Sequence, residues 1–323
     1  MGDPPLGDRE LPESGGPSSA PGERRLRLGV VILPELPWSA ARDVWRRAEE
    51  LGCDHAWTYD HLAWRSLRDS AWYGAVPTLA AAATATERLR IGFLVASPNF
   101  RHPVPFARDL LALDDVSRGR IDLGIGAGGY GWDATVLGGT APTDRERADR
   151  FTELVELLDV LLREREVSYR GRYFTAEEAR SHPGCVQQPR IPFAIAATKP
   201  RGMRLAARFG QTWVTTGERS VESPLPAREG ARVVRAQNER LDEICARLGR
   251  DPATLRRLVV TGPSLDGGPA SVDRFHETAG RYAEAGATDL VLHWPRREPP
   301  FAADLATFER IVTSVPRRSA RYS

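Results

Sequence analysis

Short apolar runs alternate with longer amphipathic segments along almost the whole chain, and this alternation limits the fold more than any other feature. The apolar runs are nearly continuous, as expected for parallel strands that helices cover. The segments between them carry apolar residues at helical spacing. The predicted strands are residues 26–33, 55–59, 89–96, 121–125, 192–197, 212–215, 258–261 and 289–293. The predicted helices are residues 40–51, with Ser39 as N-cap, and 73–86, 103–116, 144–162, 201–209, 227–248, 272–285 and 305–315.

Eight such units over about 290 residues match the size of an α/β fold, the (β/α)8 or TIM barrel. Residues 163–190 form an irregular insertion between the fourth helix and the fifth strand, and the segment VSYRGRYF within it predicts a small hairpin. Two doubly wound domains are the alternative, and they need a linker near the middle of the chain. We expect a single domain over residues 26–323, after a disordered leader at 1–25 that is rich in Pro, Gly and Ser.

Composition excludes several classes of protein. A net charge of +2, from 45 basic and 43 acidic side chains, argues against a dedicated nucleic-acid binder. No apolar run approaches the roughly 18 to 20 residues of a membrane span. The three cysteines lie far apart and form no CxxC pair, so neither a disulfide framework nor a metal site is predicted. With no signal-peptide core in residues 1–25, the cytoplasm is the expected location.

The active site of a (β/α)8 barrel is built from the loops that follow the strands. Applied to the predicted strands, this rule selects a short set of candidate residues. They are Glu35, Asp60, His61, Trp64, Ser97, Pro98, Asn99, Phe100, Gly126, Ala127, Gly128, Gly129, Tyr130, Trp132, Ala196, Ala197, Thr198, Lys199, Arg201 and His293.

Two of these loops are suited to an anionic or flat ligand. The segment GIGAGG at 124–129 formally matches the dinucleotide fingerprint GxGxxG, but three strand–helix units precede it and no helix follows directly. A glycine loop in a barrel, which lets a ligand approach the backbone, is the favoured interpretation. The turn at 196–202 contains Lys199, the only lysine of the chain. It would suit a phosphate, although an ordinary helix cap explains it equally well.

His61 is the sharpest catalytic candidate, because an imidazole at the end of a barrel strand can exchange a proton near neutral pH. The alternative is a histidine that caps backbone groups. His102 is expected to orient the loop that enters the third helix, and His293 lies either in the pocket or packed within the last strand.

At these residues the chain resembles the luciferase-like monooxygenase family, and within it the branch that uses the deazaflavin coenzyme F420. The resemblance spans residues 26–315. Its motifs are Arg101-His102-Pro103, Leu113-Asp114, Ser117, Gly119-Arg120, 123–128, 169–174, 196–198, 200–202, 205–207 and Gly210.

The resemblance implies a cofactor ring over the barrel mouth, with a non-prolyl cis peptide near residues 96–98 and Asn99 at the ring's polar edge. It assigns the ribityl chain and phosphate to the glycine loop and the 198–201 turn. Cofactor contacts are therefore expected from Asp60, Ser97, Pro98, Asn99, Gly126, Ala127, Gly128, Gly129, Ala196, Ala197, Thr198, Lys199 and Arg201. His61 is the first choice for the proton donor and Tyr130 the second. Glu35, Trp64, Phe100, Trp132 and His293 would line the substrate pocket.

The predicted function is a reductase that uses F420H2 to transfer a hydride to a C=C, C=N or C=O bond. An FMN-dependent monooxygenase of the same family is the alternative, and a lyase or hydrolase without a redox cofactor is a second. Members that oxidise sugar phosphates carry a glutamate where this chain has Gly129, so the resemblance does not by itself support that substrate class or that general acid. We expect a small-molecule or modified-peptide substrate, no nucleic-acid or membrane partner, and an assembly compatible with a homodimer. Residues 163–190 and 217–226 are expected to cover the mouth.

Overall fold

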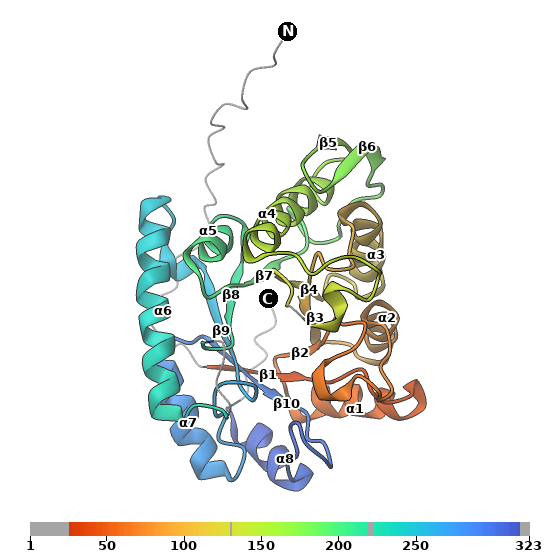
Figure 1. Ribbon diagram of the computed structural model, residues 1–323. Coiled ribbons are helices and arrows are strands. Elements are labelled where there is room, and N and C mark those ends of the chain that lie inside the picture. Colours follow the sequence, from red (N-terminus) through yellow and green to blue (C-terminus); the bar gives the residue numbers. More distant parts are fainter. Residues whose placement is uncertain (1–25, 130, 219–222, 317–323) are drawn as a thin grey trace.

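A closed barrel of eight parallel strands forms the centre of the molecule (Figure 1). The computed structural model describes residues 26–129, 131–218 and 223–316. The barrel strands are β1 (Arg27–Val31), β2 (His55–Thr58), β3 (Arg90–Ala96), β4 (Ile121–Gly126), β7 (Phe193–Ala196), β8 (Thr212–Thr215), β9 (Arg256–Val260) and β10 (Asp289–His293). β1 pairs with β10 and thereby closes the ring. The predicted (β/α)8 architecture is confirmed.

A helix follows each barrel strand and packs on the outside of the barrel. These helices are α1 (Trp38–Leu51), α2 (Ala75–Ala85), α3 (Pro103–Val116), α4 (Asp144–Leu161), α5 (Pro200–Phe209), α6 (Ala227–Arg247), α7 (Val272–Glu284) and α8 (Leu305–Ser314). Their buried faces and the outer faces of the strands form one large apolar layer. A second apolar cluster fills the barrel interior, including Val31, Trp57, Leu94, Val214 and Val291. Within the described ranges, no helix is both long and apolar enough to cross a membrane.

The end of β3 is irregular where it meets β4. The pairing register shifts between Phe93 and Ala96. The non-prolyl cis peptide lies between Leu94 and Val95, so its predicted position at residues 96–98 is wrong. The reason is visible in β4, where a Cβ atom added to Gly126 would lie 2.6 Å from the Val95 side chain. The irregular segment therefore packs where the glycines of β4 leave room for it.

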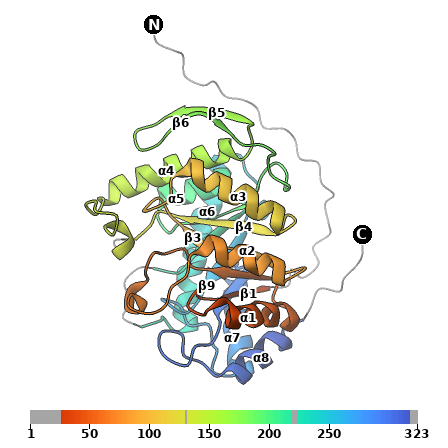
Figure 2. The same cartoon turned by 90° about the vertical axis from the view of Figure 1, so that its right-hand side faces the viewer.

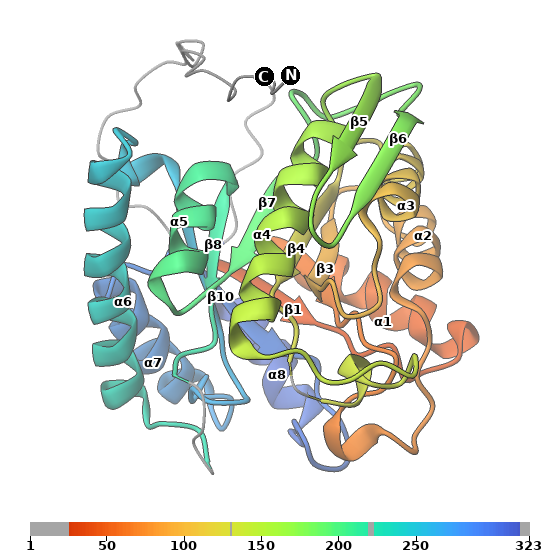
Figure 3. The ribbon, with the colours of Figure 1, turned by 45° about the horizontal axis from the view of Figure 1, so that its top comes forward.

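The predicted hairpin is present in the insertion that follows α4, as β5 (Glu166–Arg170) and β6 (Thr175–Arg180). It packs on the outer side of α4 and α3, as Figures 2 and 3 show. Glu153 of α4 accepts hydrogen bonds from the backbone N–H groups of Tyr173 and Phe174, and Arg108 of α3 donates to the carbonyl of Arg180. The hairpin is thus fixed to the barrel wall, and the expectation that it covers the mouth is wrong. Residues 219–222, in the other segment expected there, lie outside the described residues.

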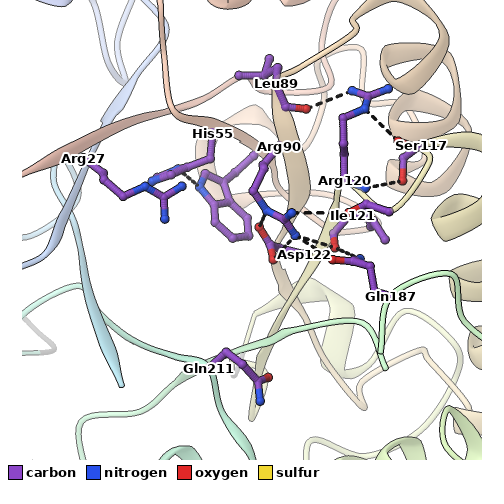
Figure 4. Close-up of polar contacts among 12 residues, drawn as sticks. Arg27, His55, Leu89, Arg90, Ser117, Arg120, Ile121, Asp122, Gln187 and Gln211 are labelled. Carbon is purple, nitrogen blue, oxygen red and sulfur yellow. Dashed lines mark hydrogen bonds and ion pairs between the residues drawn. The ribbon is translucent and has the colours of Figure 1, made fainter. Parts of the chain in front are cut away.

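The amino ends of the strands are closed by polar side chains (Figure 4). Arg90 forms a two-point ion pair with Asp122, and Arg120 donates to three backbone carbonyls near the end of α2 and the start of β3. His55 lies 3.0 Å from Asp289. Burial opposes the ionisation of Asp289, yet the hydrogen bond from His55, together with the charge of Arg27, lowers its pKa. Ion pairs and hydrogen bonds thus close the barrel at the amino ends of the strands, and the site is expected at their carboxyl ends.

Candidate active site

The loops that follow β2 and β4 meet through His61 and Asp133. His61 Nδ1 lies 2.5 Å from one carboxylate oxygen of Asp133. The other oxygen accepts hydrogen bonds from the backbone N–H groups of Leu62, at 2.8 Å, and Ala63, at 3.3 Å. The Trp72 indole donates to the His61 carbonyl at 2.8 Å. The predicted proton donor is therefore held on both its ring and its backbone, while its side chain stays 32% exposed.

Asp60, next to His61, is buried in an ion pair. Its carboxylate accepts from Arg101 Nε at 3.0 Å and from Nη2 at 2.7 Å, and the residue is only 2% exposed. Burial raises the pKa of Asp60, and the hydrogen bonds and charge of Arg101 act against that rise. Both carboxylate oxygens are engaged, so Asp60 joins the end of β2 to the loop after β3.

Aromatic rings pack together on the other side of His61, among the ends of β2 and β10. Trp64 lies against Tyr59 and stacks on Phe301, whose ring also stacks on His293 at a centroid distance of 3.6 Å. The Tyr59 hydroxyl lies 2.8 Å from His293 Nε2. Burial lowers the pKa of His293 to about 3, so this ring is neutral at physiological pH. His293 is therefore packed against neighbouring rings, as one alternative predicted, and this aromatic cluster also borders the mouth, as the other required.

The glycine loop contains two kinds of glycine. Gly128 has a φ of +75° and packs so closely on Asn99 that a Cβ atom would lie 2.6 Å from the Asn99 amide oxygen. Asn99 in turn donates to the carbonyl of Gly129 at 3.3 Å. Among the described residues other than its chain neighbours, a Cβ atom on Gly129 would meet nothing closer than 3.7 Å, and one on Gly131 would meet nothing within 4 Å. The latter two glycines leave open backbone against which a flat group can lie.

The start of α4 contacts both the glycine loop and the turn between β7 and α5. Arg147 of α4 donates to the carbonyl of Gly128 at 2.8 Å and pairs with Asp144. Asp144 also lies 3.8 Å from Lys199, whose side chain is 81% exposed. Arg201 pairs with Asp149 of α4 at 2.5 Å. The two predicted anion-binding segments thus share one stretch of α4.

The remaining predicted residues are paired with an arginine, buried, or partly exposed. Glu35 is paired with Arg296 at 2.7 Å, and Trp132 lies under the guanidinium of Arg68 at 3.2 Å. Ser97 and Pro98 are buried, whereas five others are partly exposed around the loops: Phe100, Ala127, Ala196, Ala197 and Thr198. Tyr130 lies outside the described residues. His102 caps α3 by accepting from the Val104 N–H, which confirms its predicted role.

Sequence reasoning missed Asp133, Arg147, Arg150 and Phe301. Arg150 donates to the Pro98 carbonyl at 2.6 Å and fixes the loop after β3. None of these residues follows a strand directly, and Asp133 meets a residue 72 positions earlier in the chain. A search of acidic residues in the loop after β4, beyond its glycines, would have found Asp133.

The site suits a flat cofactor that carries an anionic group. The open backbone at Gly129 and Gly131 could hold a ring or chain, and the start of α5 with Lys199 could hold an anion. The buried Nδ1 of His293 has no hydrogen-bond partner among the described residues and offers one further polar contact. Among the residues that the structure describes, no three His, Cys, Asp or Glu side chains lie close enough together to hold a metal ion.

Comparisons with known proteins identify a family and related proteins. A family model described as luciferase-like monooxygenase matches residues 18–275. The F420-dependent glucose-6-phosphate dehydrogenase of Beutenbergia cavernae is 35% identical over 191 residues, which are 57% of this chain and 56% of that protein. The F420-dependent hydroxymycolic acid dehydrogenase of Mycobacterium tuberculosis is 29% identical over 250 residues, 74% of this chain and 63% of that protein. The chain spans less than two thirds of the length of these curated relatives.

Solved structures show the same fold. An F420-dependent secondary alcohol dehydrogenase in complex with an F420-acetone adduct has a TM-score of 0.75 and 18% identity, with 90% of this chain and 98% of that chain covered. The family model covers well over half of the sequence. The chain belongs to the luciferase-like monooxygenase family.

Proposed function

We propose that this protein is an F420-dependent oxidoreductase that transfers a hydride between C5 of the deazaflavin and a C=C, C=N or C=O bond of a small molecule or modified peptide. The observation that carries the proposal is the His61–Asp133 pair beside an open glycine loop. Such a site joins a group that exchanges protons to a surface on which a ring can lie. The names of the relatives support F420, and the direction we propose is reduction by F420H2.

The chain's own residues would divide the work as follows. When bound, F420 supplies the hydride. Gly129, Gly131 and Asn99 would hold its ring and chain, and the 198–201 turn would hold its phosphate. His61 delivers a proton to the substrate atom on which negative charge develops. Trp64 and Phe301 exclude water from the mouth, which strengthens the polar contacts there.

The aromatic cluster also indicates the kind of substrate. Tyr59, Trp64 and Phe301 present rings, and His293 is neutral, so this side of the mouth suits an apolar or uncharged group. Arg101 and Arg296, which lie at the same end of the barrel, are already paired with Asp60 and Glu35. We therefore propose an uncharged substrate, in contrast to the sugar phosphate named for the dehydrogenase of Beutenbergia cavernae.

Replacing His61 tests the assignment of the proton donor. We expect His61→Asn to lower kcat with F420H2 roughly 10²- to 10⁴-fold, because proton transfer by a positioned side chain contributes about that much. The decay of F420H2 absorbance under anaerobic conditions measures the rate, with His276→Asn on the outer helix α7 as control. If His61→Asn and Tyr130→Phe both turn over at the parent rate, the assignment is wrong.

Replacing Lys199 tests the phosphate turn. The ammonium is exposed and only loosely paired, so its attraction for a phosphate is screened by salt. We expect Lys199→Ala to weaken F420 binding about three- to tenfold at low salt and less at high salt. Cofactor fluorescence gives the Kd at both salt concentrations. Arg204→Ala, an exposed change one turn further along α5, is the control, and equal effects of the two would remove Lys199 from the site.

A further inference from the structure

Asp133 is built into the site more firmly than a surface carboxylate requires. It is only 5% exposed, although it lies in a loop, in the short helical turn Trp132–Ala134. One oxygen faces His61 Nδ1, and the other receives the N–H groups of Leu62 and Ala63. Among the described residues, the hydrogen bonds of the Asp133 carboxylate are all with residues 61–63, the loop that carries the candidate donor.

The contact determines where the proton lies on His61. A carboxylate accepts hydrogen bonds, so Nδ1 must carry the proton that it donates to Asp133. In the neutral ring this leaves Nε2 with a free lone pair, and Nε2 has no hydrogen-bond partner among the described residues. His55 shows the opposite tautomer in the same protein. The Trp57 indole donates to its Nδ1 at 2.7 Å, so its proton is on Nε2 and points to Asp289.

We propose that Asp133 is a positioning residue that fixes the Nδ1–H tautomer of His61 and makes Nε2 the atom that exchanges a proton with the substrate. This inference rests on the proposed function. For a C=O substrate, the carbon gains the hydride from reduced F420 while the oxygen gains the proton from His61 Nε2. F420H2 loses this hydride and, to solvent, one ring proton, and is thereby oxidised. The carbonyl becomes an alcohol, and the imidazolium becomes a neutral ring whose Nδ1–H still donates to Asp133. In the reverse direction, neutral Nε2 accepts the alcohol proton.

The same contacts also permit a purely structural role, in which Asp133 only holds the N–H groups of residues 62 and 63. The two roles differ in the variant Asp133→Asn. Its amide oxygen can still accept from Leu62 and Ala63, which turns the amide NH2 toward His61 Nδ1. Nδ1 must then accept, and the proton moves to Nε2. A structural role is preserved in this variant, whereas the positioning role is reversed.

The first experiment measures the tautomer of His61 by NMR of the full-length protein labelled with ¹⁵N at histidine, without cofactor. His61→Asn identifies the signal, and His55 provides an Nε2–H reference in the same spectrum. We expect the parent to show the Nδ1–H pattern and Asp133→Asn to show the Nε2–H pattern. Asp69→Asn, at an exposed aspartate nearby, is the matched control and should leave the parent pattern unchanged.

The second experiment measures turnover. We expect Asp133→Asn to lower kcat roughly 10²- to 10⁴-fold while KM and the Kd for F420 change less than about threefold, because a wrong tautomer impairs proton transfer and leaves binding intact. An unchanged tautomer, or an equal loss of cofactor affinity, would overturn the positioning role. Failure of the parent to bind F420 would instead overturn the proposed function, and the tautomer result would stand on its own.

Discussion

Arg101→Leu is expected to lower the free energy of unfolding by about 3–5 kcal/mol at pH 7. The variant leaves the Asp60 carboxylate buried without its partner, and breaking a buried ion pair in this way costs about that much. Urea unfolding followed by circular dichroism measures the change. Arg145→Leu, at an arginine that is 87% exposed and 4.0 Å from its partner, is the control and should lose almost nothing.

The loss should shrink in acid. Because the folded-state pKa of Asp60 is raised, its protonated form stabilises the folded protein below the ordinary pKa, and this stabilisation is lost as pH rises through the raised value. Without Arg101 the pKa of Asp60 rises further. The free energy of unfolding of Arg101→Leu should therefore lie closer to that of the parent at pH 5 than at pH 7. The double variant Asp60→Asn/Arg101→Leu should recover part of the loss at pH 7. A deficit that is the same at both pH values would show that Asp60 is not buried as described.

His293 makes the stability of the parent depend on pH. The folded ring has a pKa of about 3 against an ordinary value of 6.5, so the unfolded chain binds one proton more between these limits. Stability is therefore full above pH 6.5 and falls by about 1.4 kcal/mol for each unit below it. When the pH is lowered from 7 to 5, we expect the free energy of unfolding of His293→Gln to fall by about 2 kcal/mol less than that of the parent.

Urea unfolding at pH 7, 6 and 5 tests this slope. His276→Gln, on the exposed side of α7, is the control and should keep the slope of the parent. The readout is the difference between pH values within each variant, so any loss of packing against Phe301 cancels. Parallel slopes for the parent and His293→Gln would contradict a neutral buried ring.

The fold could be predicted in detail because it depends on patterns that repeat along the chain. Each parallel strand is a short apolar run, and each covering helix has apolar residues at helical spacing. The predictions are wrong where a strand begins with charged residues, or where tertiary packing determines the position of an element. β9 begins at Arg256, two residues before the predicted start, because Arg256 and Arg257 pair with Thr212 and Trp213 despite their charge. The hairpin's place on α4 depends on Glu153, whose contacts no local pattern contains.

The site was predictable as a set of positions and much less as a set of contacts. The rule that loops after barrel strands form the site brought His61, Asn99 and the 198–201 turn to one end of the barrel. It did not predict that Asp60 binds Arg101, 41 positions later in the chain, or that His61 binds Asp133, 72 positions later. Such pairs depend on which side chain of a loop turns inward, and only the folded backbone determines that.

The most direct test of the central proposal is a titration of the purified full-length chain with F420 and, separately, with FMN, followed by cofactor fluorescence. We predict saturable binding of F420 that weakens with salt, and much weaker binding of FMN. Gly129→Val provides a matched change within the loop, because its side chain would project into the open space over the backbone and should reduce F420 binding. Tight binding of FMN without binding of F420 would contradict the account, and binding of neither would favour a barrel enzyme without a redox cofactor.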